Sequence, residues 1–470
     1  MSDRTALVTG ASGYVGSQLV PALLEQGWTV RVLARNPGGL AQAWRDRVDV
    51  VQGDATDPDA LAEALAGCRV AYYLLHSMDG KGDYRDRDRR LARQFADSAR
   101  AAEVGRIVYL SGLHPHLSGL HPQGRLSDHL ASRVEVGEIL LESGVPTAVL
   151  QAGVVLGEGS ASFDMLRHLT ERLPVSFGPK WLRNRIQPIA VSDVVHYLVR
   201  AADLDPGVNR TIDVGMPEQL TYLEMMRRYA AATGLGPRLV GTVPVLTPRL
   251  ASLWVGLVTP VPAGIARPLV GSLINDAVKS EDDAATLLGD PEGGLKGFED
   301  AIALATRDID PHRWGRTLAT VSAAVAATAV AGSLLTDPDS AWYRSLRKPT
   351  WQPPASAFPI VWTGLYAIIA VATTAAITEA EEAGDLEKAA GLRRSLAVNL
   401  PLNAAWSGIF FRSRNLPAAT LGAAALAASS ADLARRAATT GAGKAVGLGL
   451  YAAWCGFATA LSAELARLNR

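Results

Sequence analysis

Three glycines spaced three residues apart, Gly10, Gly13 and Gly16, are the first residues whose types and spacing suggest chemistry. An apolar segment precedes them and an amphipathic stretch follows. Glycine has no side chain, so such a turn lets the backbone approach a pyrophosphate, which then lies on the amides of a helix N-terminus. The pattern predicts a dinucleotide-binding turn whose contact residues are Gly10, Ser12, Gly13, Tyr14, Val15 and Gly16.

Arg35 follows the second apolar run, Thr29–Ala34, at the position where an NAD-selective fold carries an acid. A guanidinium pairs with a ribose 2′-phosphate, so NADP(H) is predicted in preference to NAD(H). The third run, which begins at Val50, ends at Asp54 and Ala55, and we expect these two residues to lie near the adenine amino group. No metal is expected, because His114, His116 and His121 have no nearby carboxylate or cysteine.

Ser127–Glu135 carries the remaining candidates for catalysis, together with Ser111 at the end of another apolar run. His129 and Arg133 share a helix face at a spacing of four. His129 is a candidate proton donor, Arg133 a candidate ribose contact and Ser111 a hydroxyl partner. An exposed helix face with ordinary polar residues explains the same pattern equally well.

Aromatic residues crowd the segment Trp342–Tyr366, which holds three tryptophans, two tyrosines and four prolines around a basic loop. Indole rings prefer the membrane–water boundary, and prolines stiffen a loop that caps a membrane cavity. The segment runs directly into uncharged apolar sequence. We therefore expect a binding site beneath a loop at a membrane surface.

The elements that position these residues fall on two sides of a compositional break near Pro311. Before it, apolar runs such as Ala71–His76 and Ile107–Gly112 alternate with amphipathic stretches, which predicts an α/β Rossmann-like, doubly wound parallel sheet. After it come five nearly uncharged segments, which predict an all-α five-helix transmembrane bundle. These are Thr317–Leu335, Ala355–Thr378, Ser395–Phe411, Asn415–Ala431 and Ala445–Ala463. The predicted domains are residues 1–310 and 311–470.

Composition excludes several classes of protein. Lys plus Arg equals Asp plus Glu at 46 each, so no global field would hold nucleic acid. Two distant cysteines, Cys68 and Cys455, exclude a disulfide framework. The first residues are too polar for a secretory signal. Basic residues are nearly balanced between the two ends of the spans, so the N-terminal domain is placed in the cytoplasm, at the cell membrane, because its cofactor is there.

Residues 4–310 resemble the short-chain dehydrogenase/reductase superfamily, in its atypical, NmrA-like branch. The glycine turn carries the resemblance, together with Gln187–Val195, where Asp193 is expected to cap a helix. The superfamily's catalytic Tyr-x-x-x-Lys pair is absent, since no tyrosine has a lysine four residues later. This departure leaves open whether the domain is an oxidoreductase. The broken apolar region Thr242–Ile274 is expected to cover the substrate cleft or to lie on the membrane surface.

Residues 314–470 resemble the TspO/MBR family of tryptophan-rich sensory, or translocator, proteins. Three motifs carry this resemblance: Trp342–Tyr366, Asn399–Phe411 and the run from Tyr451 to Asn469. It implies a pocket for porphyrin, haem or another flat apolar ligand, and a homodimer through the bundle. The matching positions are Trp351, Trp362, Tyr366, Asn403, Trp406 and Trp454. Leu450 and Ser462 depart from the family's pattern, which weakens sterol binding most.

Two hypotheses follow. In the first, the N-terminal domain binds NADP(H) and regulates ligand sensing or transport by the bundle. In the second, the protein is a membrane-tethered, NADPH-dependent reductase of an apolar substrate such as a tetrapyrrole or an isoprenoid. A third alternative is that the two halves are independent and merely joined.

Overall fold

Two compact units make up the structure, a computed structural model that describes residues 4–75, 84–114, 126–243, 255 and 258–470. The first unit ends at Ile309 and the second begins at Asp310.

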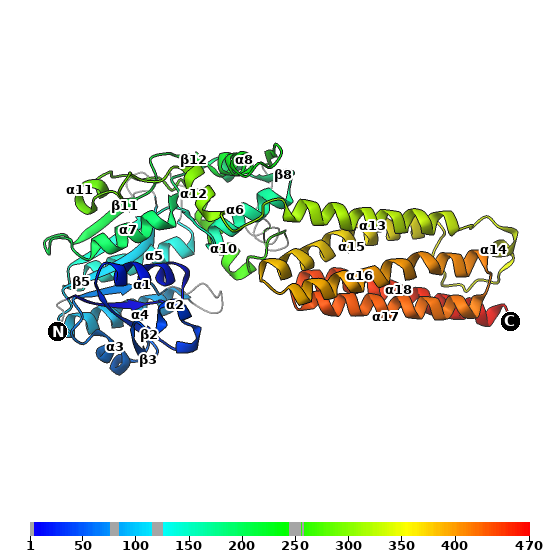
Figure 1. Cartoon of the computed structure of the whole chain (residues 1–470), viewed down its shortest axis with the longest axis horizontal. Coiled ribbons are helices and arrows are strands. Elements are labelled where there is room, and N and C mark those ends of the chain that lie inside the picture. Colours follow the sequence, from blue (N-terminus) through cyan, green and yellow to red (C-terminus); the bar gives the residue numbers. More distant parts are fainter. Residues whose placement is uncertain (1–3, 76–83, 115–125, 244–254, 256–257) are drawn as a thin grey trace. The chain divides into compact units, whose positions relative to one another are not determined.

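A parallel sheet forms the centre of the first unit, with the strand order β11-β6-β5-β4-β1-β2-β3 (Figure 1). All of its neighbouring strands pair in parallel. The order reverses between β1 and β4, and ligands of open α/β sheets bind at such a switch point. The strands are β1 (Thr5–Thr9), β2 (Thr29–Ala34), β3 (Asp49–Gln52), β4 (Val70–Tyr73), β5 (Arg106–Gly112), β6 (Thr147–Ala152) and β11 (Arg210–Val214). The doubly wound prediction is confirmed, although β4 ends at Tyr73 and His76 lies outside the described residues.

Helices cover both faces of this sheet, because its strands are apolar on both sides. One face packs on α1 (Tyr14–Glu25), α2 (Gln42–Arg45), α7 (Val191–Ala201) and α11 (Ala284–Leu288). The other face packs on α3 (Pro58–Leu65), α4 (Tyr84–Ala101) and α5 (Asp128–Leu141). The helix α5, which carries His129 and Arg133, therefore packs directly on the sheet whose strand β5 carries Ser111.

A second hydrophobic core lies beside the sheet and is built around Phe163, Tyr229 and Phe298. Its helices are α6 (Ala161–Arg172), α8 (Tyr222–Ala232), α10 (Ala263–Ser272) and α12 (Phe298–Ala305). Its strands pair as β7 (Val155–Leu156) with β10 (Ile189–Ala190), β9 (Arg185–Ile186) with β12 (Leu220–Thr221), and β8 (Val175–Pro179) with β13 (Leu239–Val243). Short helical turns are η1 (Pro37–Gly39) and η3 (Lys180–Arg183).

The apolar region expected to cover a cleft or to lie on a membrane is described only in part, because residues 244–254 and 256–257 lie outside the described residues. Val255, Val261, Ala266 and Val270 are buried in the second core. These four residues pack within the first unit, and both expected roles of the region stay predictions.

Long helices form the second unit (Figure 1). They are α13 (Arg313–Leu335), α15 (Ala357–Glu382), α16 (Leu386–Ser407), α17 (Leu416–Ala438) and α18 (Ala442–Leu468). A short helix, α14 (Ala341–Ser345), lies in the aromatic segment, and α16 continues into the π-helical turn η4 (Gly408–Arg412).

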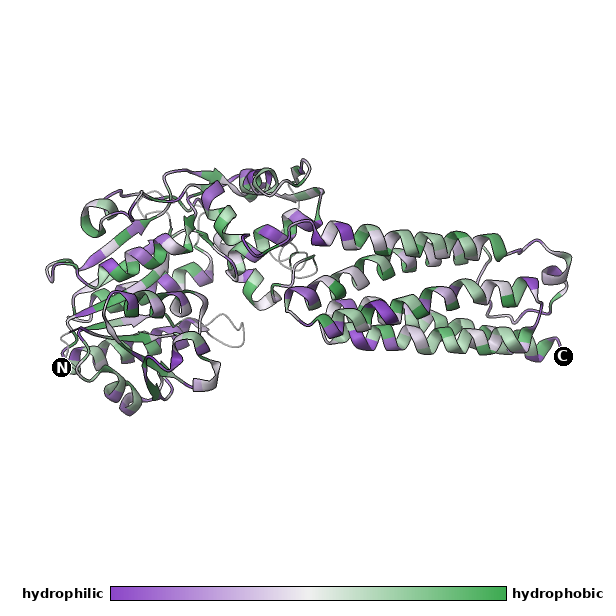
Figure 2. Cartoon of the chain, in the orientation of Figure 1, coloured by the Kyte–Doolittle hydropathy of each residue, from purple (hydrophilic) through white to green (hydrophobic). Residues whose placement is uncertain are grey.

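Four helices of the described chain, rather than the predicted five, are long and apolar enough to cross a membrane: α13, α15, α17 and α18. The exception is α16, whose first half carries Glu387, Lys388, Arg393 and Arg394. Asn399 and Asn403 lower its hydropathy further along. In Figure 2, hydrophilic residues gather mainly toward the ends of the long helices. The five-span prediction is thus confirmed for four helices and not for α16.

Charged residues that the sequence pattern assigns to loops lie on helices instead, which corrects the predicted boundaries. The second span extends to Glu382, and α16 begins at Leu386, well before the predicted Ser395. Ion pairs between helices explain the difference: Arg393 binds Glu381, and Lys444 of α18 binds Glu379 of α15. Paired side chains can remain at the edge of an apolar helix.

Candidate functional site

The glycine turn has the close-packed geometry that a phosphate cradle requires. Gly10 has a φ of 73°, and a Cβ atom there would lie 2.6 Å from the carbonyl oxygen of Leu74. A Cβ atom at Gly16 would lie 2.3 Å from the carbonyl oxygen of Gly10. The helix that follows, α1, has no acidic residue in its first turn. Its N-terminal amides can therefore hold the pyrophosphate of a dinucleotide, and the residues present fit that cofactor.

Tyr14 and its neighbours show which parts of the turn face outward. Ser12 and Gly13 are exposed, whereas Val15 is partly buried. The Tyr14 ring lies against Gly157, where a Cβ atom would come within 2.2 Å of the phenolic oxygen. Burial, helped by Asp164 and Glu158, raises the pKa of Tyr14. The Tyr14 side chain therefore stays neutral and packs against Gly157, so that only the backbone of Tyr14 contributes to the glycine turn.

Arg35 lies at the end of β2 with 83% of its side chain exposed. Its Nε atom is 3.8 Å from Oδ2 of Asp54. The Thr56 backbone N–H and hydroxyl both donate to Asp54 Oδ1, at 2.9 and 2.8 Å, and the backbone bond is the main cause of the lowered pKa of Asp54. Because Asp54 is held by Thr56, the guanidinium has only a loose ion pair and can accept a phosphate. Ala55 is partly buried beside them.

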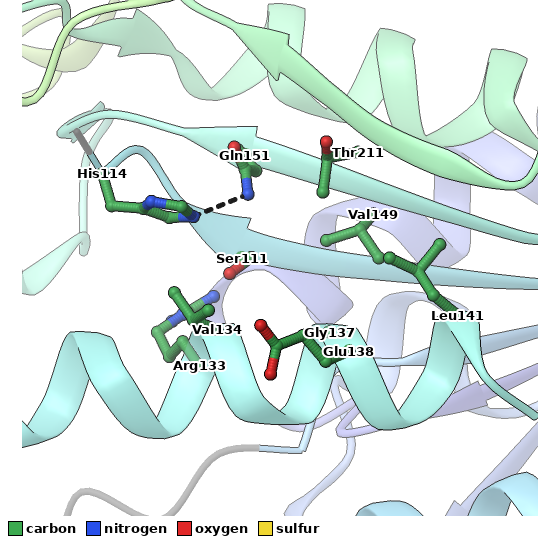
Figure 3. Close-up of a pocket in the computed structure, with 10 residues that line it drawn as sticks. All are labelled: Ser111, His114, Arg133, Val134, Gly137, Glu138, Leu141, Val149, Gln151 and Thr211. Atoms are coloured by element: carbon green, nitrogen blue, oxygen red, sulfur yellow. Dashed lines mark hydrogen bonds between the residues drawn. The ribbon is translucent and has the colours of Figure 1, made fainter. Parts of the chain in front are cut away.

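A cavity of about 300 Å³ opens between α5 and the strands β5, β6 and β11 (Figure 3). Its lining combines polar residues of the strands with a side along α5 that carries both apolar and charged residues, Arg133 and Glu138 among them. The lining residues are Ser111, His114, Arg133, Val134, Gly137, Glu138, Leu141, Val149, Gln151 and Thr211. We call this space the α5 cavity.

Strand register brings the polar residues of the α5 cavity together. Ser111 of β5 lies opposite Gln151 of β6, because parallel strands end at the same edge of the sheet. His114 follows β5 directly, and its Nε2 atom is 2.9 Å from Nε2 of Gln151 (Figure 3). The Gln151 amide thereby fixes the orientation of the imidazole ring.

Arg133 supplies positive charge to the same cavity. Its Nη2 group donates a hydrogen bond to the carbonyl oxygen of Leu110, and the guanidinium lies 5.9 Å from the centre of the Tyr109 ring. Ser111 is 3% exposed. An imidazole, a hydroxyl and a guanidinium around one space can donate a proton and stabilise a developing negative oxygen.

His129 lies on α5 but does not line the α5 cavity. It is 7% exposed, and burial, followed by the charge of Arg133, lowers its pKa to about 3. The imidazole is therefore neutral at ordinary pH. Of the three predicted catalytic candidates, the structure brings Ser111 and Arg133 together and leaves His129 outside. Sequence reasoning considered His114 only as a metal ligand and missed Gln151.

Asp193, expected to cap a helix, has a different partner. The N-cap residue of α7 is Ala190, with no side-chain cap bond. The Asp193 carboxylate, 1% exposed, instead accepts a 2.8 Å bond from the backbone N–H of Lys296 and pairs with Lys296 Nζ at 3.4 Å. The capping prediction is wrong because Asp193 joins α7 to the chain segment before α12.

The predicted ligand residues of the second unit divide into three aromatic groups. Trp362 lies 5.4 Å from Tyr366 and 6.3 Å from Tyr451, between ring centres. Trp454 packs on Phe358 and Phe457, and Trp351, which is 48% exposed, packs on the same Phe457. Trp406 stacks on Phe410. That these six residues surround one ligand pocket stays a prediction.

Asn403 belongs to a chain of hydrogen bonds between buried side chains of four helices. Tyr366 donates to Asn403 Oδ1 at 2.9 Å, and Asn403 Nδ2 donates to Tyr451 at 3.1 Å. Tyr451 in turn donates to Asn399 Oδ1 at 2.9 Å, and Asn399 Nδ2 donates to Ser430 at 3.0 Å. We call these five residues the buried polar chain.

Two cavities of the second unit lie where charged side chains gather. One, of about 350 Å³, lies between α16 and α17, and the other, of about 360 Å³, lies among α13, α15 and α16. The first is lined by Gly391, Arg394, Ser395, Val398, Ser429, Asp432 and Arg436. The second is lined by Arg313, Arg316, Thr317, Glu381, Leu386 and Arg393. None of the six predicted ligand residues lines either cavity.

Comparison with protein families finds two matches along the chain. Residues 10–154 match the NAD(P)H-binding family, and residues 320–468 match the TspO/MBR family. The chain therefore joins an NAD(P)-binding domain to a TspO/MBR membrane domain, as the two resemblances predict. Together with the four apolar helices, this match identifies an integral membrane protein.

Curated relatives match the first unit. The ceramide reductase of Caulobacter vibrioides is 30% identical over 244 residues, which cover 50% of this chain and 72% of that protein. Sterol demethylase protein B of Methylococcus capsulatus is 32% identical over 27% of this chain and 39% of that protein. The 3 beta-hydroxysteroid dehydrogenase/Delta 5-->4-isomerase of Mycobacterium tuberculosis is 28% identical over 43% of this chain and 60% of that protein. The chain thus spans less than two thirds of the last two relatives.

Solved structures share the fold of the first unit. The NADPH-dependent quinone oxidoreductase QOR2 of Escherichia coli, complexed with NADPH, superposes with a TM-score of 0.50 at 20% identity. The match covers 63% of this chain and 98% of that one. The triphenylmethane reductase of Citrobacter sp. gives a TM-score of 0.50 at 18% identity, over 64% and 99% of the two chains.

Proposed function

The chain belongs through its first unit to the family of the ceramide reductase, and on that premise we propose that it is an NAD(P)H-dependent reductase of a lipid-like carbonyl compound. The observation that carries the proposal is the set His114, Gln151, Ser111 and Arg133 around one cavity at the ends of β5 and β6. These residues offer what the missing Tyr-x-x-x-Lys pair would otherwise supply.

Each residue has a distinct part in carbonyl reduction. When bound, NAD(P)H supplies the hydride that reduces the carbonyl carbon. His114, oriented by Gln151, gives a proton to the carbonyl oxygen. Arg133 and Ser111 stabilise the negative charge that develops on that oxygen before the proton arrives. The products are an alcohol and the oxidised cofactor.

The position of Arg35 supports NADPH as the physiological cofactor. Its guanidinium is exposed beside the end of β2 and is only loosely paired with Asp54. No carboxylate lies at the end of β2 itself, where a ribose 2′-hydroxyl would need one. A 2′-phosphate would therefore meet a cation there.

Three features support an apolar, lipid-like substrate. The α5 cavity is apolar along Val134, Leu141 and Val149. The chain includes a TspO/MBR membrane domain, which keeps the reductase unit near the bilayer. The names of two relatives, ceramide reductase and sterol demethylase protein B, point to lipids.

Turnover by the detergent-purified full chain tests this proposal. NADPH absorbance would be followed with a long-chain 3-ketone and with acetone at equal concentration. We expect oxidation of NADPH with the long-chain ketone and much less with acetone. Cofactor binding without oxidation, across a panel of lipid ketones, would mean that the first unit only senses NADPH.

A second function is favoured by the aromatic group at Trp362. We propose that the bundle binds a flat apolar ligand such as a porphyrin, because Trp362, Tyr366 and Tyr451 bring three rings next to the polar Asn403. Protoporphyrin IX should quench tryptophan fluorescence, and W362L should weaken that binding. The matched control is W181L, in the first unit. Equal quenching curves for W362L and wild type would exclude this site.

A further inference from the structure

The cavity between α16 and α17 has the chemistry of a headgroup site. Two guanidinium groups, Arg394 and Arg436, line it together with the hydroxyl groups of Ser395 and Ser429. From these side chains we propose that the groove binds an anionic phospholipid through its phosphate, independently of the function of the first unit.

The charges in the groove do not cancel. Asp432 is the acid in the lining, and it is held by three partners: Arg436 Nε at 2.6 Å, Arg435 Nη2 at 2.6 Å and the Ser395 hydroxyl at 3.1 Å. Arg394 makes only a long bond of 3.4 Å to the carbonyl oxygen of Ala390, and no carboxylate of the described residues pairs with it. An anion between Arg394 and Arg436 would meet unmatched positive charge.

Gly391 leaves room for the guanidinium group of Arg436 beside α16. A Cβ atom at Gly391 would lie 3.1 Å from Nη1 of Arg436, so the guanidinium lies flat against α16 at that point. Its Nε atom points to Asp432 and its Nη1 atom toward α16. A larger residue at position 391 would push the arginine away from the groove.

The lining of the groove also includes an apolar side chain, Val398, along which an acyl chain would lie. Val398, one turn or about 6 Å further along α16 than Arg394, is 58% exposed. The helix α17 is apolar enough to cross a membrane, whereas α16 is not one of the four candidate spans. A phosphate at the arginines with a chain along Val398 matches a phospholipid better than a free anion.

The groove also reaches the interior of the bundle. Ser429, which lines it, accepts a 3.2 Å hydrogen bond from Nδ2 of Asn399 in the buried polar chain. The Ser429 hydroxyl hydrogen remains available to a phosphate oxygen. A bound headgroup would therefore contact Ser429, which is bonded to Asn399 of the buried polar chain.

Native mass spectrometry of the detergent-purified full chain tests the proposal by titration with phosphatidylglycerol, phosphatidylcholine and inorganic phosphate. We expect phosphatidylglycerol to bind at least fivefold more tightly than phosphatidylcholine. R394Q and R436Q should each weaken that binding by about fivefold, the effect of one surface arginine on anionic lipid. The matched control is R435Q, which removes the same charge from a residue that bonds to Asp432 but does not itself line the groove.

Three outcomes would overturn the proposal. Equal binding of the two lipids would mean that the charges do not select the headgroup. Equal losses in R435Q and R394Q would show a general field rather than a site. Displacement of phosphatidylglycerol by millimolar phosphate would identify a free anion as the ligand. R394Q alone decides if R436Q unfolds, because the bond of Arg394 to the carbonyl oxygen of Ala390 is long and exposed.

Discussion

The α5 cavity and the buried polar chain both gather polar side chains, but they use them in opposite ways. In the α5 cavity, Ser111, His114 and Arg133 face an open space of about 300 Å³. In the membrane domain, Asn399, Asn403 and Tyr451 bond to one another and are at most 5% exposed. The first arrangement leaves hydrogen-bonding capacity for a ligand, and the second uses it within the protein.

The α5 cavity is therefore suited to holding a ligand, whereas the buried polar chain is suited to holding helices in position. Polar groups within a membrane domain are costly unless they are satisfied, so amides and hydroxyls that bond head to tail hold helices in register. The five residues of the buried polar chain are tyrosine, asparagine and serine, so this set contains no carboxylate, lysine, arginine or histidine. The reduction that we propose is therefore assigned to the first unit.

Replacement of His114 should have the largest effect, because it removes the proposed proton donor. We expect H114A to lower kcat with a long-chain ketone by about 100-fold or more, with a smaller change in KM. Stopped-flow oxidation of NADPH measures both. The control is H196Q, whose imidazole contacts the carbonyl oxygen of Gly289 and lies outside the cavity lining. A loss in H114A no greater than in H196Q would remove His114 from the mechanism.

Acid should destabilise the first unit and leave the buried polar chain unaffected. The pKa of His129 falls from 6.5 to about 3 on folding, so the folded state excludes a proton that the unfolded chain binds. Above pH 6.5 His129 is neutral in both states and does not lower the free energy of unfolding. At pH 5 the unfolded chain binds the proton, which lowers the free energy of unfolding by about 2 kcal/mol. Urea unfolding at pH 8 and pH 5 measures the change.

The variant H129Q provides the control for that experiment. Glutamine does not titrate, so the loss of stability between pH 8 and pH 5 should shrink by about 2 kcal/mol in the variant. An unchanged pH dependence in H129Q would show that other groups cause the acid sensitivity.

Breaking the buried polar chain should cost less than either of these changes. We expect N399L to destabilise the bundle by about 1.5 kcal/mol, because Tyr451 and Ser430 lose their partner. L421A, at a position 73% exposed on α17, serves as control and should change stability by less than about 0.5 kcal/mol. Thermal unfolding followed by far-UV circular dichroism measures both. Equal stabilities of N399L and wild type would mean that the chain does not hold the helices.

The smallest effect is expected at Arg35. Its guanidinium is mostly exposed, so solvent weakens its pairing with a 2′-phosphate. We expect R35A to reduce the preference for NADPH over NADH by about fivefold, measured from the two dissociation constants. R45A, on α2, is the matched control. A preference that does not change in R35A would place the selectivity elsewhere.

Sequence patterns predict the fold well where local spacing decides it. The spacing of Gly10, Gly13 and Gly16 predicts the turn, and alternating apolar runs predict the sheet, because both depend on short segments. The aromatic and asparagine motifs predict the membrane family. The helix α16 was harder, because the partner of a charge on it can lie on another helix, as Glu381 does for Arg393.

The candidate site could be predicted only in part, because it depends on strand register. Ser111 and Arg133 lie at positions that a superfamily pattern marks, and both line the α5 cavity. His114 and Gln151 are 37 residues apart and meet only when β5 and β6 pair. The spacing of four from Ser395 through Asn399 and Asn403 to Ser407 was a readable signal of the polar face of α16.

Transfer of a labelled hydride tests most directly whether the first unit catalyses reduction. The full chain in lipid nanodiscs would receive NADPH deuterated at C4 of the nicotinamide, one stereoisomer at a time, with a long-chain 3-ketone. We expect mass spectrometry to find one deuterium on the carbinol carbon of the alcohol from one stereoisomer, and about 100-fold less product in H114A. Bound NADPH with no labelled alcohol from any lipid ketone would contradict catalysis and leave the unit as a sensor.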